Sequence, residues 1–152
     1  MAPPRLWRLL PAIVCSLALG AGCVAPARSF DAYEGKAVTT AEDALSAVET
    51  ARLAVTAAAN RHAFATYLSV VLGDAEDAAS SVQGTFDSVQ PPDARSDAVR
   101  SDLDDRLQSA VSVLADLRIA VRRGEADRLP SRLEDLAKAA QALREFQDAH
   151  QQ

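Results

Sequence analysis

The sequence predicts an all-α protein: an antiparallel up-and-down bundle of three to four amphipathic helices after an N-terminal signal helix and a short tether. Over most of residues 40–150, apolar residues recur at spacings close to three and four, as on one face of a helix. Proline and glycine interrupt this pattern at a few points, and no stretch shows the alternation typical of strands. Helices joined by short turns pack most simply with their neighbours antiparallel.

The chain opens with a basic segment, then an apolar run, then small residues. Arg5 and Arg8 are the only charged residues before Arg28, and the apolar run Leu9–Cys23 lies between Arg8 and Arg28. This order is typical of an export signal, in which the arginines stay on the cytoplasmic side while the apolar run enters the membrane. We therefore expect residues 28–152 to lie outside the cytoplasmic membrane.

The end of this run, Leu19-Gly20-Ala21-Gly22-Cys23, resembles the signal of bacterial lipoproteins. The resemblance covers residues 1–23. It implies a signal peptide over residues 1–22 and a Cys23 that carries lipid, including palmitate, as the first residue of a membrane-anchored mature chain. Gly20 stands where the family usually has leucine. Two other outcomes stay open: cleavage at Ala25-Pro26-Ala27 to give a secreted protein, and retention of the uncharged residues 9–27 as a membrane span.

The charge and cysteine content bear on the expected partners. A chain that begins at Cys23 keeps 14 of the 16 Lys and Arg and all 21 Asp and Glu, a net charge near −7. Nucleic acids and anionic lipid surfaces favour basic proteins, so neither is an expected partner. Because Cys15 falls inside the signal, Cys23 has no second cysteine for a disulfide or a metal cluster. A lipid on Cys23 would explain a lone thiol in an exported chain.

Residues 23–39 are expected to form the lipidated N-terminus and the tether, ahead of a bundle domain over residues 40–150. Phe30 and Tyr33 are unusual in a pure spacer. They either dock on the folded body, which we prefer, or lie among lipid headgroups, where amphipathic rings are favoured.

The first helix is expected to begin at Thr39 or Thr40, because Thr39 and Glu42 have the spacing of a capping box. Near Asn60 the apolar pattern changes face. The helix therefore either breaks there or continues with another face inward, and we favour a long helical segment with an irregularity. The stripe before this point consists of Ala41, Leu45, Val48, Val55, Ala59 and His62.

The clearest stripe alternates spacings of four and three, as in a helix packed against near-antiparallel neighbours. The same rhythm suits the seam of a dimeric coiled coil, but Pro91-Pro92 and Gly124 favour hairpins within one chain. The stripe consists of Phe64, Leu68, Val71, Ala75, Ala78, Val82, Phe86 and Val89.

Asp93 or Ser96 is expected to cap the next helix, whose end is marked by Gly124. The last helix is expected to begin between Asp127 and Ser131, with Ser131 and Glu134 as a capping box. The apolar stripe of the first of these helices is Val99, Leu103, Leu107, Ala110, Leu114, Leu117 and Val121; that of the last is Leu133, Leu136, Ala140, Leu143 and Phe146.

A search for chemistry-bearing motifs finds none. Neither His62 nor His150 has the Glu three residues earlier that di-iron bundles use, and Met1 is the only methionine for a His/Met haem. There is no nucleophile elbow, and the glycines after the signal are too scattered for a phosphate loop. We therefore expect no enzyme, no cofactor, no metal and no catalytic residue.

Charged residues gather at the two ends of the third predicted helix. Aspartates crowd its start and arginines crowd its end, as the helix dipole favours. If a surface recognises a partner, the arginines are the first candidate, because arginine is enriched at interfaces. This candidate partner surface consists of Arg118, Arg122, Arg123, Arg128 and Arg132.

The expected function is that of a non-enzymatic structural or adaptor module of the bacterial cell envelope. The lipid on Cys23 would hold it on the cell membrane, facing away from the cytoplasm, and another envelope protein would be its partner. The alternative is a small-ligand or ion carrier that binds its cargo in the bundle core.

Overall fold

The computed structural model describes residues 27–151 except Arg61 and Ala63. The run Leu9–Cys23, and with it the predicted signal peptide and lipid site, lies outside the described residues. Among the described helices, none combines the length and the apolarity that crossing a membrane requires.

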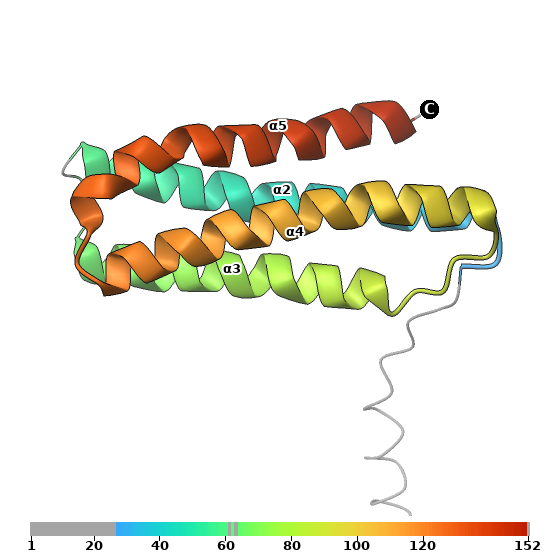
Figure 1. Cartoon of the computed structure of the whole chain (residues 1–152), viewed down its shortest axis with the longest axis horizontal. Helices are drawn as coiled ribbons and strands as arrows, with labels where there is room; N and C mark the ends of the chain where they lie inside the picture. The colour runs from blue at the N-terminus through green and yellow to red at the C-terminus, as the bar shows by residue number, and fades with distance from the viewer. Residues whose placement is uncertain (1–26, 61, 63, 152) are drawn as a thin grey trace, which may run out of the picture.

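Four long helices and one short 3₁₀ helix make up the described chain (Figure 1). Successive long helices run in opposite directions, which confirms the predicted all-α bundle; the described residues contain no strand. α2 and α4 pack against each other through the middle, with α3 and α5 on opposite sides of this pair. The elements are α2 (Phe30–Ala59), α3 (Ala65–Asp87), α4 (Ala94–Arg122), η2 (Ala126–Arg132) and α5 (Leu133–His150).

We call the end of the bundle where α2 begins the proximal end. α3 ends, α4 begins and α5 ends there, whereas the α2–α3 turn, the end of α4 and η2 lie at the opposite, distal end (Figure 1).

α2 begins at Phe30, so the prediction of a start at Thr39 or Thr40 is wrong. Ser29 caps it in an extended conformation, and its hydroxyl accepts a hydrogen bond from the backbone N–H of Ala32 at 3.3 Å. The predicted tether is therefore helical from Phe30 onward. The physical reason is that the buried face of α2 continues toward its start through Ala37 and Tyr33.

The two aromatic residues of this segment dock on the bundle, as we preferred. Tyr33 is fully buried, and its ring centroid lies 5.4 Å from that of Phe86. Phe30 is partly buried against the core, with the guanidinium of Arg95 3.8 Å from its ring centroid.

The helix ends at Ala59 and a new one begins at Ala65, whereas the sequence favoured one long helical segment with an irregularity near Asn60. The backbone N–H of His62 donates to the carbonyl of Ala57 at 2.8 Å, a closure that is common at helix ends. Phe64 then stands in an extended conformation as the N-cap of α3. This break lets α3 fold back along α2, and Ala59 and His62, the last members of the first predicted stripe, are exposed.

α4 agrees with the prediction along its whole length. Asp93 caps it, and the carboxylate accepts a hydrogen bond from the backbone N–H of Ser96 at 2.9 Å. Hydrogen bonds from Ser96 hold the pKa of Asp93 below its usual 3.8, because they favour the charged carboxylate. Every residue of the predicted stripe from Val99 to Val121 is buried.

The last helix begins at Leu133, later than the predicted range from Asp127 to Ser131, because the 3₁₀ helix η2 occupies the connection from α4. Gly124 has the left-handed φ of 73° that ends many helices, and η2 follows with Leu129 buried. The expected capping box is wrong: the Ser131 hydroxyl donates to the carbonyl of Arg128 at 2.7 Å, and α5 begins at Leu133 without a side-chain cap. The predicted stripe of α5 is nevertheless buried, apart from the partly buried Leu133.

Side-chain contacts also tie the long helices together. Arg118 of α4 binds Glu76 of α3 through two hydrogen bonds. On the other side of the bundle, Arg106 of α4 donates to the carbonyl of Ala142 in α5 at 2.5 Å. These contacts fix the position of α4 along its axis relative to α3 and α5.

Candidate functional site

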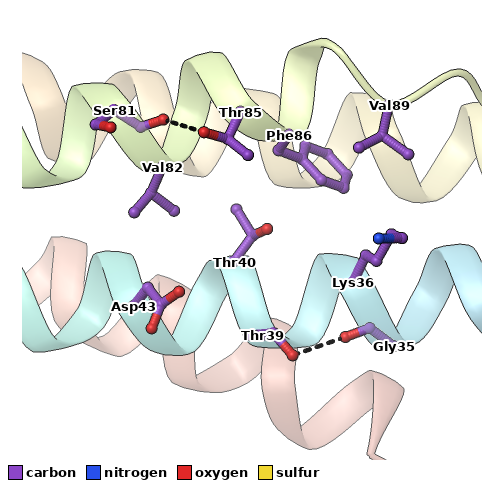
Figure 2. Close-up of a pocket in the computed structure, with 10 residues that line it drawn as sticks. All are labelled: Gly35, Lys36, Thr39, Thr40, Asp43, Ser81, Val82, Thr85, Phe86 and Val89. Atoms are coloured by element: carbon purple, nitrogen blue, oxygen red, sulfur yellow. Dashed lines mark hydrogen bonds between the residues drawn. The ribbon is translucent and has the colours of Figure 1, made fainter. Parts of the chain in front are cut away.

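An open groove runs between α2 and α3, and we call it the α2–α3 groove (Figure 2). Its larger cavity has a volume of about 640 Å³. Val82 of α3 and Thr40 of α2 point toward each other across it. The lining residues are Gly35, Lys36, Thr39, Thr40 and Asp43 from α2, with Ser81, Val82, Thr85, Phe86 and Val89 from α3 and the turn after it.

The groove continues toward the distal end as a second cavity of about 320 Å³. Asp43 lines both cavities, which joins them into one surface feature along the two helices. The other lining residues of the second cavity are Ser46, Ala47, Thr50, Val71, Asp74, Ala75 and Ala78.

Ten of the lining residues fall into two regular stripes, five on α2 and five on α3. Spacings of three, four, three and four recur on both α2 and α3, which is the rhythm of a helix-packing seam on a face outside the core. The stripe of α2 is Lys36, Thr39, Asp43, Ser46 and Thr50, and that of α3 is Val71, Asp74, Ala78, Ser81 and Thr85.

The threonines of these stripes satisfy their hydroxyl donors within their own helix. Thr39 donates to the carbonyl of Gly35 at 3.0 Å, and Thr50 and Thr85 donate to the carbonyls four residues earlier, each at 2.8 Å. The groove therefore offers mainly hydrocarbon surface, with charge supplied by Lys36 and by two aspartates, Asp43 and Asp74.

The clearest predicted stripe proves to be only partly a core stripe. Leu68, Ala75, Phe86 and Val89 are buried as expected, but Phe64 and Ala78 are exposed, and Val71 and Val82 are half-buried. α3 is rotated so that Leu72 and Ala79, which were not predicted, enter the core. This rotation leaves Val71, Ala78 and Val82 on the groove side.

Three members of the predicted arginine surface are engaged within the protein. Arg118 is half-buried and bound by Glu76, whose hydrogen bonds raise the pKa of the guanidinium. Arg128 and Arg132 each pair with a carboxylate three residues away, at 3.3 and 3.4 Å. The structure brings these arginines to the distal end but does not leave them all free for a partner.

Arg122 and Arg123 differ from these three. Both are exposed, and neither forms an ion pair with another described residue. The recognition role of the arginine surface stays a prediction, and these two residues are its accessible part.

A buried polar cluster lies near the proximal end. The hydroxyl of Tyr33 and one carboxylate oxygen of Asp104 are buried without a hydrogen-bond partner among the described residues. Burial raises the pKa of both groups, and the nearby carboxylate of Asp87 raises that of Asp104 further. Arg100 is the neighbouring cation, with its guanidinium 3.6 Å from Asp104 and bonded to the carbonyl of Asp87 at 2.9 Å.

The two histidines occupy separate places. His62 is exposed in the α2–α3 turn, whereas His150 is the last residue of α5 and lies 2.8 Å from the carboxylate of Glu34. Within the described part of the chain, no group of three or more His, Cys, Asp or Glu is placed to hold a metal ion.

The fold and the groove define a class: a helical bundle with an open groove between two adjacent helices. No protein-family model, no curated protein and no solved structure matches the chain. The α2 half of the groove was missed from the sequence because its stripe of Thr, Ser and Asp resembles a solvated face. Its regular spacing was the signal that could have revealed it.

Proposed function

We propose that this protein is a lipid-anchored, non-enzymatic adaptor of the bacterial cell envelope whose α2–α3 groove binds an amphipathic helix of another envelope protein. The matching pair of stripes in the groove carries the proposal. Two adjacent antiparallel helices with such stripes can bind a further helix in the groove between them. The bound helix would pack against side chains that are spaced three and four residues apart on each of the two helices.

The dimensions and charges of the groove describe its occupant. From Lys36 to Thr50, α2 rises about 21 Å, which corresponds to about four turns of a partner helix. Small and apolar side chains fit the hydrocarbon of the groove. A carboxylate opposite Lys36 and a lysine or arginine opposite Asp43 and Asp74 would complement its charges.

The anchor is the second part of the proposal, and the resemblance of residues 1–23 to a lipoprotein signal supports it. With lipid on Cys23 and Ala27 already buried against the bundle, residues 24–26 alone connect the two. Three residues reach about 10 Å when extended, so the proximal end of the bundle would stay near the membrane.

The carrier alternative predicts a ligand in the bundle core. The described core contains large, fully buried side chains, among them Tyr33, Phe86 and Phe146, and both cavities described above open on the α2–α3 face. This arrangement favours an adaptor with a surface groove over a carrier with an internal site.

Replacement of the lipid-bearing residue tests the anchor. In the full chain, Cys23→Ala should abolish labelling by a fatty-acid probe and release the protein from the membrane fraction, whereas Cys15→Ala should keep both. If Cys23→Ala stays on the membrane unchanged, residues 9–27 are a retained span and the anchor proposal is wrong.

Site-specific photo-crosslinking in native envelopes tests the groove. A photoreactive residue at Ser46 should give one protein adduct, and the same residue at the exposed Ala137 of α5 should not. Ala78→Arg fills the groove and should remove the Ser46 adduct, while the matched Ala98→Arg on the exposed face of α4 should keep it.

Two outcomes would contradict the groove proposal. The first is an adduct that survives Ala78→Arg. The second is a small molecule that native mass spectrometry finds on the purified protein and that Ala78→Arg removes, which would make the groove a carrier site.

A further inference from the structure

The exposed large hydrophobic side chains of the described chain gather at the distal end. Leu53 lies near the end of α2, Phe64, Tyr67 and Val70 at the start of α3, and Ile119 near the end of α4 (Figure 1). Their exposed fractions are 67%, 86%, 58%, 57% and 36% in that order. We call these five residues the distal patch.

The patch is large for a surface that faces only water. Phe64, Tyr67 and Val70 follow one another at spacings of three, so they share one side of the first turns of α3. With typical side-chain areas, Leu53 and these three residues expose roughly 500 Å² of mostly apolar surface. Contiguous apolar patches of about this size on monomers often mark an interaction site.

Exposed arginines accompany the patch. Arg122 and Arg123 end α4 at the same end of the bundle, exposed and without an ion pair to another described residue. Arg122 lies one turn after Arg118, whose contact with Glu76 marks the side of α4 that faces α3. The two arginines therefore lie on the part of α4 that runs beside the start of α3.

Carboxylates also occur toward the distal end, but arginines balance them: Glu76, Glu125 and Asp135 pair with Arg118, Arg128 and Arg132. The excess of negative charge lies at the other end of the bundle. The aspartates that begin α4, Asp93, Asp97 and Asp105 among them, are at the proximal end. α2 spans the bundle and is about 45 Å long, whereas salt screens charges over about 8–10 Å. The acidic end therefore does not oppose an anionic surface that touches the distal end.

We infer that the distal patch docks on an anionic lipid surface. Aromatic and aliphatic side chains would enter the boundary between headgroups and acyl chains, and Arg122 and Arg123 would pair with lipid phosphates. In the sequence, Leu53 and Phe64 lie on either side of the α2–α3 turn, which is at one end of the elongated bundle (Figure 1). Such an end can meet a flat bilayer without a matching cavity. From the net charge of the whole chain, anionic lipid was not an expected partner. The local charge at the distal end replaces that expectation.

Vesicle co-sedimentation tests the inference with the chain from residue 24 to 152, which contains every described element and the closed core but no lipid. Circular dichroism first confirms that each variant is helical. Binding to vesicles of phosphatidylcholine with 30% phosphatidylglycerol should be at least tenfold stronger than to phosphatidylcholine alone, and it should weaken as salt rises.

Variants assign the binding to the patch and its arginines. Tyr67→Ser and, separately, Phe64→Ser should each weaken binding several-fold. Arg122→Glu with Arg123→Glu should remove the preference for phosphatidylglycerol. Arg28→Glu with Arg95→Glu lowers the net charge equally, but at or near the proximal end, and should keep the preference.

Three results would overturn the inference: no binding to anionic vesicles, equal loss in the two charge-reversed proteins, or binding unchanged by both serine variants. A fourth is binding to native envelope fragments but not to vesicles made from their extracted lipids, which would assign the patch to a protein partner. The test uses neither Cys23 nor the α2–α3 groove, so its outcome is independent of the proposed function.

Discussion

Replacing Tyr33 by phenylalanine should stabilise the protein. The ring of Tyr33 is fully buried and packs on Phe86, and phenylalanine keeps this contact. The hydroxyl, in contrast, is buried without a hydrogen-bond partner among the described residues. Burial is also the main cause that raises its pKa above the usual 10.0, which agrees with a hydroxyl cut off from water.

The expected gain follows from what an unpaired hydroxyl costs. Burying one without a hydrogen bond costs about 1–3 kcal/mol in protein mutants. Phenylalanine removes this cost but loses the few dispersion contacts of the oxygen atom. We therefore expect the free energy of unfolding to rise by about 1–2 kcal/mol, and the melting temperature by about 4 °C or more.

Urea unfolding at neutral pH, followed by circular dichroism, measures this change on the chain from residue 24 to 152. Tyr67→Phe is the matched control, because Tyr67 is 58% exposed and its hydroxyl can meet water; its effect should stay within about 0.5 kcal/mol. If Tyr33→Phe instead lowers the free energy of unfolding by 1 kcal/mol or more, the hydroxyl has a partner and the reasoning is refuted.

Three further substitutions probe the core, a helix end and the proximal polar cluster by the same unfolding assay. Leu114→Ala, at a fully buried position, should lower the free energy of unfolding by about 2–5 kcal/mol, whereas Leu53→Ala, at an exposed one, should change it by less than about 0.5; equal effects would contradict the assigned core. Gly124→Ala should cost about 1–2 kcal/mol because the left-handed φ of 73° crowds a Cβ, and no loss would mean that the turn relaxes. Asp104→Asn tests pH dependence: the raised pKa of Asp104 means that the folded protein holds this proton at pH values where the unfolded chain has released it. The stability that this proton contributes is therefore lost as pH rises above 3.8 and through the folded pKa. The free energy of unfolding of the asparagine variant should rise relative to that of the natural protein over the same pH range; a constant difference would argue against this.

α4 could be predicted from the sequence because several independent signals agree along it. Asp93 follows two prolines, the stripe from Val99 to Val121 is unbroken, and Gly124 follows the last turn. A stripe made mainly of leucine and valine specifies one buried face, because no other face of that helix carries an equally long run of large apolar residues. The same reasoning explains why the stripe of α5 was found although the predicted cap at Ser131 was wrong.

The start of α2 and the rotation of α3 required the folded structure. Around Tyr33, the neighbouring residues are polar or small, so the first turns of α2 resemble a spacer until Phe86 supplies a contact from far along the chain. On α3, the adjacent pair Val71 and Leu72 offers two choices of inward face. Packing between the helices decides such choices, and periodicity alone cannot.

The α2–α3 groove was invisible from the sequence for a related reason. Its stripe on α2 consists of polar and small residues, which hydropathy assigns to solvent. Only the position of α3 beside it, set by the break near Asn60, turns two unremarkable faces into the walls of one groove. The exposed Arg122 and Arg123 were predicted as part of a larger set, because ion pairs such as that between Arg118 and Glu76 depend on the packing of separate helices.

The uninterrupted length of α2 would set the distance between the two proposed membrane contacts of the protein. With lipid at one end and the distal patch at the other, the two membrane contacts of the molecule would face opposite directions. The protein would act as a rigid spacer: about 45 Å of helix, plus up to about 10 Å for residues 24–26, would set the gap between two bilayers. The number of turns in α2, rather than any side chain, would then determine how closely those surfaces can approach.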